Sequence, residues 1–493
     1  MPEYPTLAAV DLGSNSFHLQ VGRVEGEQLF YLDAHKEAVR LAAGLGEDKR
    51  LDAASQKRAL DCLARFGERL QGMPAGAVRA VGTSALRVAK NSNEFLKQAK
   101  AALGFDIEIV AGREEARLIY LGVAHSLPLS SEPRLVVDIG GGSTECIIGV
   151  GYEPQERESL RMGCVVFSKR YFPDGRIDKA ALKAAVTAAR VEAQSVAKQF
   201  KRGHWAEAVG SSGTARALAE LCQQAGLSDG AITADGLKWL REQAVKAGSS
   251  DRLDLPGLKP ERKPVIVGGL AIMSALFEEL KIESMQAAQG AMREGILWDL
   301  LGRVHDHDMR DVTVEQFMRR YHVDRRQAER VERFALHLFR AFQDSCPVAA
   351  TQCLGWSAKL HEIGISIAHS GFHKHSAYIL ENADMPGFSR QDQMRLASLV
   401  RASRGSLAKL PVQPDEGLWP LILCLRLAVR LHQNRTEVGL PEWRLVCKGG
   451  DCQFQLPAGW LAANPLTQAA LESEIKDWRG LAAPVRLAGL REL

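Results

Sequence analysis

The chain has 493 residues, of which 46% are hydrophobic and 25% are charged, values typical of a globular protein and not of a disordered chain or a coiled coil. Its 63 basic and 59 acidic residues leave a formal net charge of +4, which is too small to indicate nucleic-acid binding through bulk charge. At roughly 150 residues per domain, the length suggests about three domains.

The cysteines and the apolar segments favour a cytoplasmic protein. Nine cysteines contain no CxxC pair, and their spacings fit neither a zinc site nor a disulfide scaffold. A reducing compartment is therefore expected. Glu3 and the lack of an apolar core after it predict no signal peptide. The longest uncharged apolar stretch, residues 264–277, is too short to span a bilayer, so we expect at most peripheral association with the inner face of the cell membrane.

Strand and helix patterns alternate through the first 300 residues, which favours an α/β fold. In the first 120 residues, strands are predicted at 7–10, 21–24, 29–32, 79–81 and 107–109, and helices at 53–70, 93–103 and 112–125. A second cycle has predicted strands at 135–137, 147–150, near Val209 and at 265–267, and helices at 179–200 and 293–301.

After about residue 303 the glycines become rarer and helical patterns dominate. Helices are predicted at 314–321, 327–342, 356–363, 391–404 and 418–432, followed by a small strand pair at 444–446 and 452–456. The sequence thus predicts an α/β region followed by a separate all-α domain.

Two predicted strands each end in an aspartate that is followed by glycine and hydroxyl residues. Residues 11–16 read Asp-Leu-Gly-Ser-Asn-Ser, and residues 138–145 read Asp-Ile-Gly-Gly-Gly-Ser-Thr-Glu. Small residues let backbone N–H groups approach a phosphate, and Mg²⁺ commonly uses one or two carboxylates together with substrate phosphates. The first turn alone is equally well explained as a plain β-turn. Two such turns, about 127 residues apart, predict duplicated lobes that face one anion.

Two further glycine turns, at residues 209–214 and 267–271, follow apolar runs and are predicted to open helices, whose N-termini attract anions. The GxGxxG fingerprint and the GxxxxGK[ST] pattern are both absent. A Rossmann dehydrogenase and a P-loop ATPase are therefore disfavoured.

Seven motifs occur in order between about residues 7 and 302: AAVDLGSNSFH, VGTSALR, AGREEARLIYLGV, VVDIGGGSTE, MGCV, GSSGT and GAMREG. With LHEIG and HSAYIL further along, this set resembles the exopolyphosphatase and guanosine-pentaphosphate phosphatase (Ppx/GppA) family. The resemblance implies two ribonuclease-H-like lobes of the actin and sugar-kinase superfamily, at 1–120 and 121–302. It also implies an HD-like helical domain at 303–493, with a small subdomain from about 440, and a homodimer.

The resemblance implies hydrolysis of a phosphoanhydride bond, and two substrate branches compete. The third glycine of DIGGGSTE and the segments MGCVVFSKRYFPDG and HSGFHKHSAYIL look more like the branch that releases orthophosphate from the end of inorganic polyphosphate. The alternative is a 5′-phosphohydrolase of guanosine pentaphosphate (pppGpp). The EEARL signature argues against a kinase or chaperone-like ATPase of the superfamily, and both retained glycine turns argue against a non-catalytic sensor.

By the same resemblance, Glu115 of EEARL activates the attacking water. Glu114 lies about 100° away on the same predicted helix, so only one of the two can face the cleft; a solvated helix face is the alternative explanation of this charged segment. Arg87 is expected to grip phosphate. Asp138 and Glu145 are expected to hold Mg²⁺, with Asp11 as an outer candidate. The remaining candidate substrate-binding residues of the lobes are Gly13, Ser14, Asn15, Gly140, Gly141, Gly142, Ser143, Thr144 and Gly213.

In the helical domain, His361 and Glu362 resemble the histidine–aspartate pair of HD phosphohydrolases. Glu362 and Val429 stand where metal-binding aspartates would be expected, so this metal centre is expected to be lost. Basic residues nevertheless cluster, and we expect Lys374, Arg401 and Arg404 to bind a long polyanion, with further basic side chains continuing the path at Lys409, Arg426, Arg430 and Arg435. No aromatic residues interleave with them, which disfavours nucleic acid.

Overall fold

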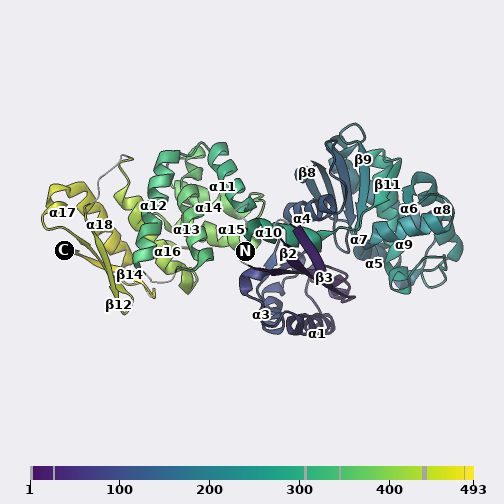
Figure 1. Cartoon of the computed structure of the whole chain (residues 1–493), viewed down its shortest axis with the longest axis horizontal. Helices are drawn as coiled ribbons and strands as arrows, with labels where there is room; N and C mark the ends of the chain where they lie inside the picture. The colour runs from purple at the N-terminus through teal and green to yellow at the C-terminus, as the bar shows by residue number, and fades with distance from the viewer. Residues whose placement is uncertain (1–3, 26–27, 305–307, 343–345, 436–440, 482) are drawn as a thin grey trace. The chain divides into compact units, whose positions relative to one another are not determined.

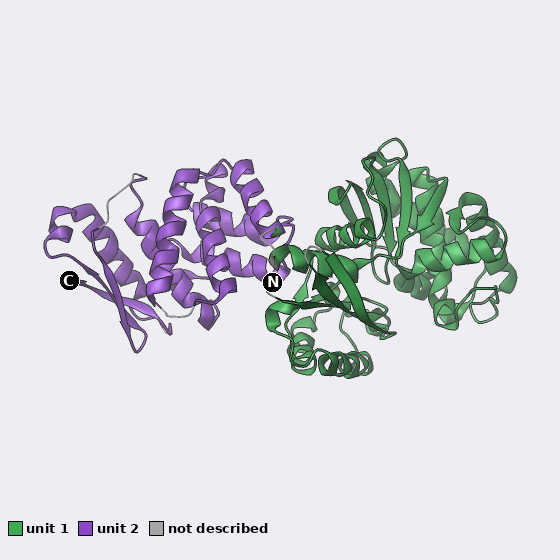
Figure 2. Ribbon diagram, in the orientation of Figure 1, with its two compact units in different colours: residues 1–308 green, residues 309–493 purple. Residues whose placement is uncertain are grey.

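The computed structural model describes residues 4–25, 28–304, 308–342, 346–435, 441–481 and 483–493. Two compact units make up the chain, residues 1–308 and residues 309–493, and each is described by itself (Figure 2). Unit 1 contains two α/β lobes, and unit 2 is mostly helical (Figure 1). Within the described ranges, no helix combines the length and the apolar character that a membrane span needs.

The first lobe is built on a five-stranded sheet in the order β3-β2-β1-β4-β5. Its strands are β1 (Thr6–Leu12), β2 (Phe17–Glu25), β3 (Gln28–Glu37), β4 (Val78–Gly82) and β5 (Ile107–Ile109). Strand β1 alternates between two cores. Ala8 and Val10 pack on the side of α1 (Ala53–Arg69) and α3 (Ser92–Leu103), whereas Leu7 and Ala9 face the opposite side. This period of two is what a strand buried on both faces requires.

The second lobe repeats this topology in a six-stranded sheet, ordered β10-β11-β9-β6-β7-β8. Its strands are β6 (Arg134–Ile139), β7 (Thr144–Val150), β8 (Glu153–Leu160), β9 (Glu207–Ser211), β10 (Ala231–Thr233) and β11 (Ser284–Ala287). In both lobes a three-stranded antiparallel meander is extended by two parallel strands, and the second lobe adds the edge strand β10, which is antiparallel to β11. The shared order shows that the two glycine turns, after β1 and after β6, occupy equivalent places.

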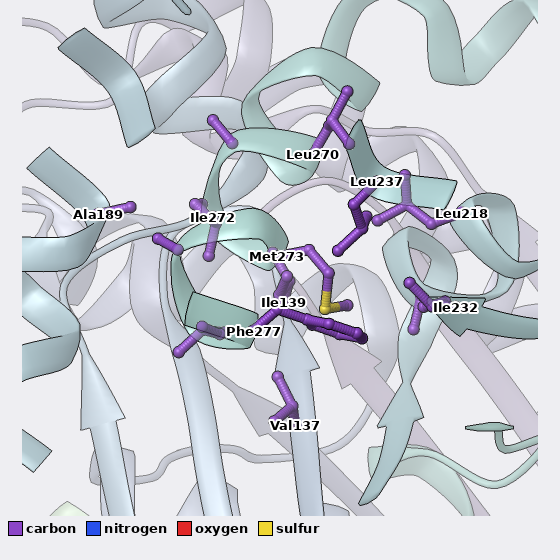
Figure 3. Close-up of a cluster of buried hydrophobic side chains, with 14 of the residues drawn as sticks. Val137, Ile139, Ala189, Leu218, Ile232, Leu237, Leu270, Ile272, Met273 and Phe277 are labelled. Atoms are coloured by element: carbon purple, nitrogen blue, oxygen red, sulfur yellow. The ribbon is translucent and has the colours of Figure 1, made fainter. Parts of the chain in front are cut away.

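Helix α9 (Lys263–Leu280) lies at the centre of the second lobe's core (Figure 3). It packs with β6, α5 (Cys164–Tyr171), α6 (Lys179–Phe200), α7 (Ser212–Gln224) and α8 (Ala234–Ala247). The strand predicted at 265–267 is therefore wrong. Residues 263–280 form one buried helix, with proline in its first turn, and a short apolar run cannot distinguish these two structures.

The glycines of this segment serve packing and do not open a helix. A Cβ on Gly268 would lie 2.5 Å from the carbonyl oxygen of Cys164, and a Cβ on Gly269 would lie 2.4 Å from Cγ2 of Thr214. Because these two residues have no Cβ atom, α9 can approach α5 and α7 closely.

Two helices connect the lobes. Helix α4 (Gly112–His125) leads from the first sheet to the second, and α10 (Met292–Val304) returns and packs on α4 and β1. Figure 1 shows both helices lying between the two sheets. The expected lobe boundary at residue 120 therefore falls inside α4, and the segment 292–304, expected in the second lobe, packs on the first.

Unit 2 contains helices α11 (Met309–Arg320), α12 (Arg325–Phe342), α13 (Val348–Leu360), α14 (Phe372–Asn382), α15 (Arg390–Ala402) and α16 (Trp419–Leu431). A three-stranded sheet follows, made of β12 (Arg444–Lys448), β13 (Asp451–Leu456) and β14 (Arg486–Glu492), with α17 (Trp460–Ala463) and α18 (Pro465–Trp478). Leu445, Cys452 and Phe454 of this sheet belong to the same core as α12 and α16. The C-terminal subdomain thus shares its core with the helices.

A disulfide joins Cys447 and Cys452. The cysteine spacings did not indicate it. It arises because the β12–β13 register places these two residues directly opposite each other. The other seven cysteines are free thiols.

The packing around α9 predicts a clear cost for a cavity there. Met273 has no exposed surface and lies among the side chains drawn in Figure 3. Met273→Ala should destabilise unit 1 by about 2–5 kcal/mol, because lost burial adds to the cost of the cavity. Urea unfolding monitored by circular dichroism measures the effect. The matched control is Val191→Ala on the exposed side of α6, which should shift stability by no more than about 0.5 kcal/mol. Equal effects of the two changes would contradict this assignment of the core.

Candidate active site

A cavity in unit 1 brings the glycine turns of both lobes together. Residues 13–16, 140–143 and 212–214 line it with backbone and small side chains. Charged and ionisable side chains complete the wall: Asp11, His18, Lys36, Glu115, Asp138, Arg216, Arg262 and Arg293. The turns predicted to face one anion therefore line the same cavity.

The two lobes approach each other at glycines, which have no side chain. A Cβ on Gly141 would lie 3.0 Å from Cβ of Ser14, and a Cβ on Gly142 would lie 2.7 Å from Oγ of Ser84. Larger residues at these two positions would push the turn of the second lobe away from the first.

Hydrogen bonds fix the second turn so that its donors remain available. The N–H of Gly140 donates to the carbonyl of Ser143 at 3.0 Å. The first N–H groups of α5, those of Cys164 and Val165, donate to the carbonyls of Gly140 and Gly141 at 2.9 and 3.0 Å. Within the described chain, the N–H groups of Gly141 and Gly142 donate to no acceptor. The turn thus offers free donors, which suit a phosphate oxygen.

A third turn places Arg262 in the cavity wall. A Cβ on Gly213 would lie 1.6 Å from Nη2 of Arg262, so only glycine leaves room for the guanidinium. Ser212 has φ +68°, a conformation that is uncommon for a residue other than glycine. Its hydroxyl donates to the carbonyl of Ile139 at 3.2 Å, as Thr214 does at 3.0 Å. These bonds tie the third turn to the end of β6.

Helix α4 turns Glu115, and not Glu114, toward the cavity. Glu115 is buried in the cavity wall, and its Oε2 accepts a hydrogen bond from Arg87 at 2.5 Å. Glu114 points elsewhere, because both its oxygens accept from Arg117 at 2.8 Å. The structure thereby separates the two adjacent glutamates that the sequence left as alternatives.

Three of the expected site residues do not line the cavity. Arg87 donates to Glu115 and, at 3.0 Å, to the carbonyl of Val110. The hydroxyl of Thr144 donates to the carbonyl of Met162 at 2.6 Å. Glu145 is buried and accepts from Ser159 at 2.8 Å. Each of these polar groups has a partner within the protein, and the expected contacts of the three residues with substrate or metal stay predictions.

The carboxylates share an environment that disfavours their charge. Burial, reinforced by Glu115, raises the pKa of Asp11 to about 8. Burial also raises the pKa of Asp138, to about 6, although Ser211 donates a hydrogen bond to it. The pKa of Glu145 is raised well above its usual range by burial and then by Glu115 and Asp138. Asp11 Oδ1 is buried, and no hydrogen-bond partner for it lies among the described residues. A cation at this wall would offset the buried negative charge.

Several positively charged side chains line the same cavity. Lys36, Arg216 and Arg262 form no ion pair with a carboxylate anywhere in the described ranges. Burial and these neighbouring cations lower the pKa of Lys36. Burial together with Arg293 and the same cations lowers the pKa of His18 to about 3, so this imidazole is neutral near pH 7. Uncompensated cations around a cavity indicate that its ligand is an anion.

These basic groups were not identified as site residues from the sequence. His18, Arg216 and Arg293 lie in or beside the motifs SNSFH, GSSGT and GAMREG, so a signal for them was present. Lys36 and Arg262 carry no motif. They reach the cavity only through the β3 strand and the gap at Gly213.

In unit 2, Lys374, Arg401 and Arg404 lie around one imidazole. Burial lowers the pKa of His373, and the nearby charges of Lys374, Arg404 and Arg401 lower it further, to about 4. Arg404 also stacks 5.2 Å from the ring centroid of Phe372, and Arg401 pairs with Glu381 at 3.7 Å. The expected basic cluster therefore exists at these positions.

From Arg426 onward, the basic side chains of the expected path are paired with carboxylates. Arg426 is fully buried and pairs with Glu474 and, at 3.0 Å, with Asp477. Arg430 pairs with Glu474 at 2.9 Å. Arg435 pairs with Glu362 at 2.6 Å, beside the buried His361. Across the described residues, no three His, Cys, Asp or Glu side chains gather as metal ligands.

Comparisons with known proteins match most of the chain. The model of the Ppx/GppA phosphatase family matches residues 21–304, and that of Ppx/GppA phosphatase, domain III, matches residues 309–475. A guanosine-5′-triphosphate,3′-diphosphate pyrophosphatase of Aeromonas hydrophila is 39% identical over 495 residues, 99% of either chain. One of Vibrio vulnificus is 40% identical over 476 residues, 95% of either chain.

Solved structures agree in fold. An exopolyphosphatase from Cytophaga hutchinsonii has a TM-score of 0.55 and 25% identity, covering 60% of this chain and 98% of its own. The Aquifex aeolicus member of the Ppx/GppA family has a TM-score of 0.51 and 26% identity, covering 61% and 98%. The names of the full-length relatives favour the guanosine pentaphosphate alternative over the polyphosphate branch that the sequence motifs suggested.

The buried carboxylates predict a pH-dependent stability. The neutral form of Asp11 is favoured by folding, so its stabilising contribution is complete below pH about 4 and is lost as pH rises toward about 8. Asp11→Asn removes this loss. In chelator, the melting temperature of the variant minus that of the natural protein should therefore increase between pH 5 and pH 8.5. Asp178→Asn, at an exposed helix cap of the same unit, is the control. A difference that stays constant across this range would show that Asp11 is not held neutral.

Proposed function

Because the chain belongs to the Ppx/GppA phosphatase family, we propose that it hydrolyses the terminal phosphoanhydride bond in the 5′-triphosphate of guanosine pentaphosphate. The observation that carries this choice is the name shared by relatives 38–40% identical over 95–99% of the chain. The products are orthophosphate and guanosine tetraphosphate.

The terminal phosphate would lie against the turns at 13–15 and 140–143. The free N–H groups of Gly141 and Gly142 donate to its oxygens, and Ser14, Asn15 and Ser143 add polar contacts. The next phosphates lie toward Lys36, Arg216 and Arg262, which form no ion pair with a carboxylate among the described residues. This arrangement favours a chain of several phosphates over a single phosphate ester.

Glu115 is the proposed general base. It accepts a proton from water as the water oxygen attacks the terminal phosphorus, and the bond from phosphorus to the bridging oxygen breaks. Arg87 orients the carboxylate through its hydrogen bond at 2.5 Å. Arg293, which lines the same cavity, stabilises charge on the transferring phosphoryl group.

The carboxylate wall fits Mg²⁺. Oδ1 of Asp11 is buried and has no hydrogen-bond partner among the described residues, and Asp138 lines the same cavity, so these two would hold the ion. Glu145 adds negative charge from outside the cavity. Since no ready-made cluster of three ligands exists among the described residues, water and substrate phosphate would supply the rest. When bound, the ion neutralises charge that develops on the phosphate oxygens.

Phosphate release from pppGpp and from long-chain polyphosphate, measured side by side with and without Mg²⁺, tests the proposal. We expect kcat/KM to be higher for pppGpp. Glu115→Gln should lower kcat by about 10²–10⁴-fold, as loss of a general base does. Glu114→Gln, assayed per folded molecule, is the matched control and should retain far more activity. A higher kcat/KM for polyphosphate would overturn the choice of substrate, and near-normal turnover of Glu115→Gln would overturn the choice of base.

Exopolyphosphatase activity is the second candidate. It is favoured by the likeness to the Cytophaga hutchinsonii exopolyphosphatase and by the cations around His373 in unit 2. A polyphosphate chain carries about one charge per residue. Cations outside the cavity would therefore add affinity for long chains only, and added salt would weaken it.

Replacing Lys374, Arg401 and Arg404 together by glutamine should raise KM for long-chain polyphosphate, with little change for short chains or for pppGpp. The effect should diminish as salt is added. The control removes the same charge from exposed sites elsewhere in unit 2, at Arg390, Lys476 and Arg479. If the control triple variant raises KM equally, the cluster has no specific role.

A further inference from the structure

Helices α4 and α10 each carry, in their first turn, one charged side chain of the candidate active site. Glu115 is the fourth residue of α4, and Arg293 is the second residue of α10. Both side chains line the cavity. The position of the carboxylate relative to the guanidinium therefore depends on how these two helices are packed.

The two helices touch backbone to backbone. A Cβ on Gly295 of α10 would lie 1.7 Å from the carbonyl oxygen of Leu118, and a Cβ on Gly122 of α4 would lie 2.0 Å from that of Ala291. The contacts at these glycines set the distance between the helices, but they do not fix how each helix is rotated. They leave the rotation of each helix about its own axis to be determined by other contacts.

A buried network of ion pairs between α4, α10 and β4 fixes this rotation. Arg117 of α4 donates to Asp299 of α10, and the two side chains are 3% and 4% exposed. Asp299 also accepts from Arg79 of β4 at 2.5 Å and from Arg303 at 3.0 Å. Although burial opposes ionisation, these arginines hold the pKa of Asp299 below its usual range.

The same arginine grips the neighbour of the proposed base. Nε and Nη2 of Arg117 each donate to one oxygen of Glu114 at 2.8 Å. Since adjacent residues on a helix point about 100° apart, holding Glu114 against Arg117 turns Glu115 toward the cavity. Arg117, Asp299, Arg79 and Arg303 do not line the cavity.

We propose that Arg117 and Asp299 are positioning residues, whose ion pair fixes the rotation of α4 against α10 and so holds Glu115 opposite Arg293. The proposal rests on the proposed role of Glu115 as base, but not on which phosphoanhydride is the substrate. Arginine is required at 117 because its planar fork reaches both Glu114 and Asp299, which a single ammonium cannot do with the same geometry.

Arg117→Lys tests this in the full chain, because it keeps the positive charge and removes the fork. We expect kcat per folded molecule to fall about 10- to 100-fold, the scale of a small displacement of a reacting group, with KM changed by less than about twofold. The matched control is Arg134→Lys. Arg134 is also buried and pairs with Glu207, but it lies on β6, and its printed hydrogen bonds go to Glu207 and to the carbonyl of Pro128, neither of which belongs to α4 or α10. The Arg134→Lys variant should be less stable than the natural protein but should keep the same kcat.

Asp299→Asn is the second variant, with nearly the same shape and no charge, and should repeat the loss in kcat. Unchanged kcat in folded Arg117→Lys, or an equal loss in Arg134→Lys, would overturn the proposal. So would failure of both variants to fold, because the network would then serve the fold and not the placement of Glu115. All variants are assayed on whichever of pppGpp or polyphosphate the natural protein hydrolyses faster. A wrong choice of substrate therefore leaves this test intact.

Discussion

The active-site region depends on one constraint: charged side chains face the cavity without an ion-pair partner among the described residues. Asp11 and Asp138 are removed from water, whereas Lys36, which is exposed, and the half-buried Arg216 and Arg262 line the same cavity. Isolated buried charges are costly, and proteins keep them mainly where a ligand will compensate them. The rest of unit 1 holds these groups in place at that cost. Three glycine turns let them approach, and two lobes supply one wall each.

The regions that hold these charged groups in place are either apolar or carry charges that are paired. The core around α9 is almost purely apolar, and Asp299 is surrounded by three arginines. The contrast between these regions is informative. Where the protein needs rigidity, as between α4 and α10, buried ions are paired within the chain. Where it needs to bind, carboxylates and cations of the same residue types are left facing a cavity.

Much of the architecture could be predicted because the patterns are local. The helix at 112–125 and the turns after β1 and β6 have their expected bounds, since glycine placement and helical periodicity do not depend on distant neighbours. The segment 265–267 was misassigned for the same reason. A short apolar run between charged residues fits a buried strand as well as a buried helix, and only the packing of Gly268 against α5 distinguishes them. The cross-strand pairing of Cys447 with Cys452 likewise depends on a hairpin register that spacing does not reveal.

The sequence by itself determined the family, the two duplicated aspartate–glycine turns, and the residue types available for phosphate chemistry. These features are encoded in short ordered motifs, each read without reference to the others. Tertiary structure decided which of those groups face the ligand. It turned Glu115 toward the cavity and Glu114 toward the buried Arg117, and it gave Arg87, Thr144 and Glu145 partners within the protein. It also brought Lys36 and Arg262 to the cavity from segments without a motif. The reason is physical: a side chain's direction and its free hydrogen-bonding capacity are set by what packs against it, and those neighbours lie far away in the chain.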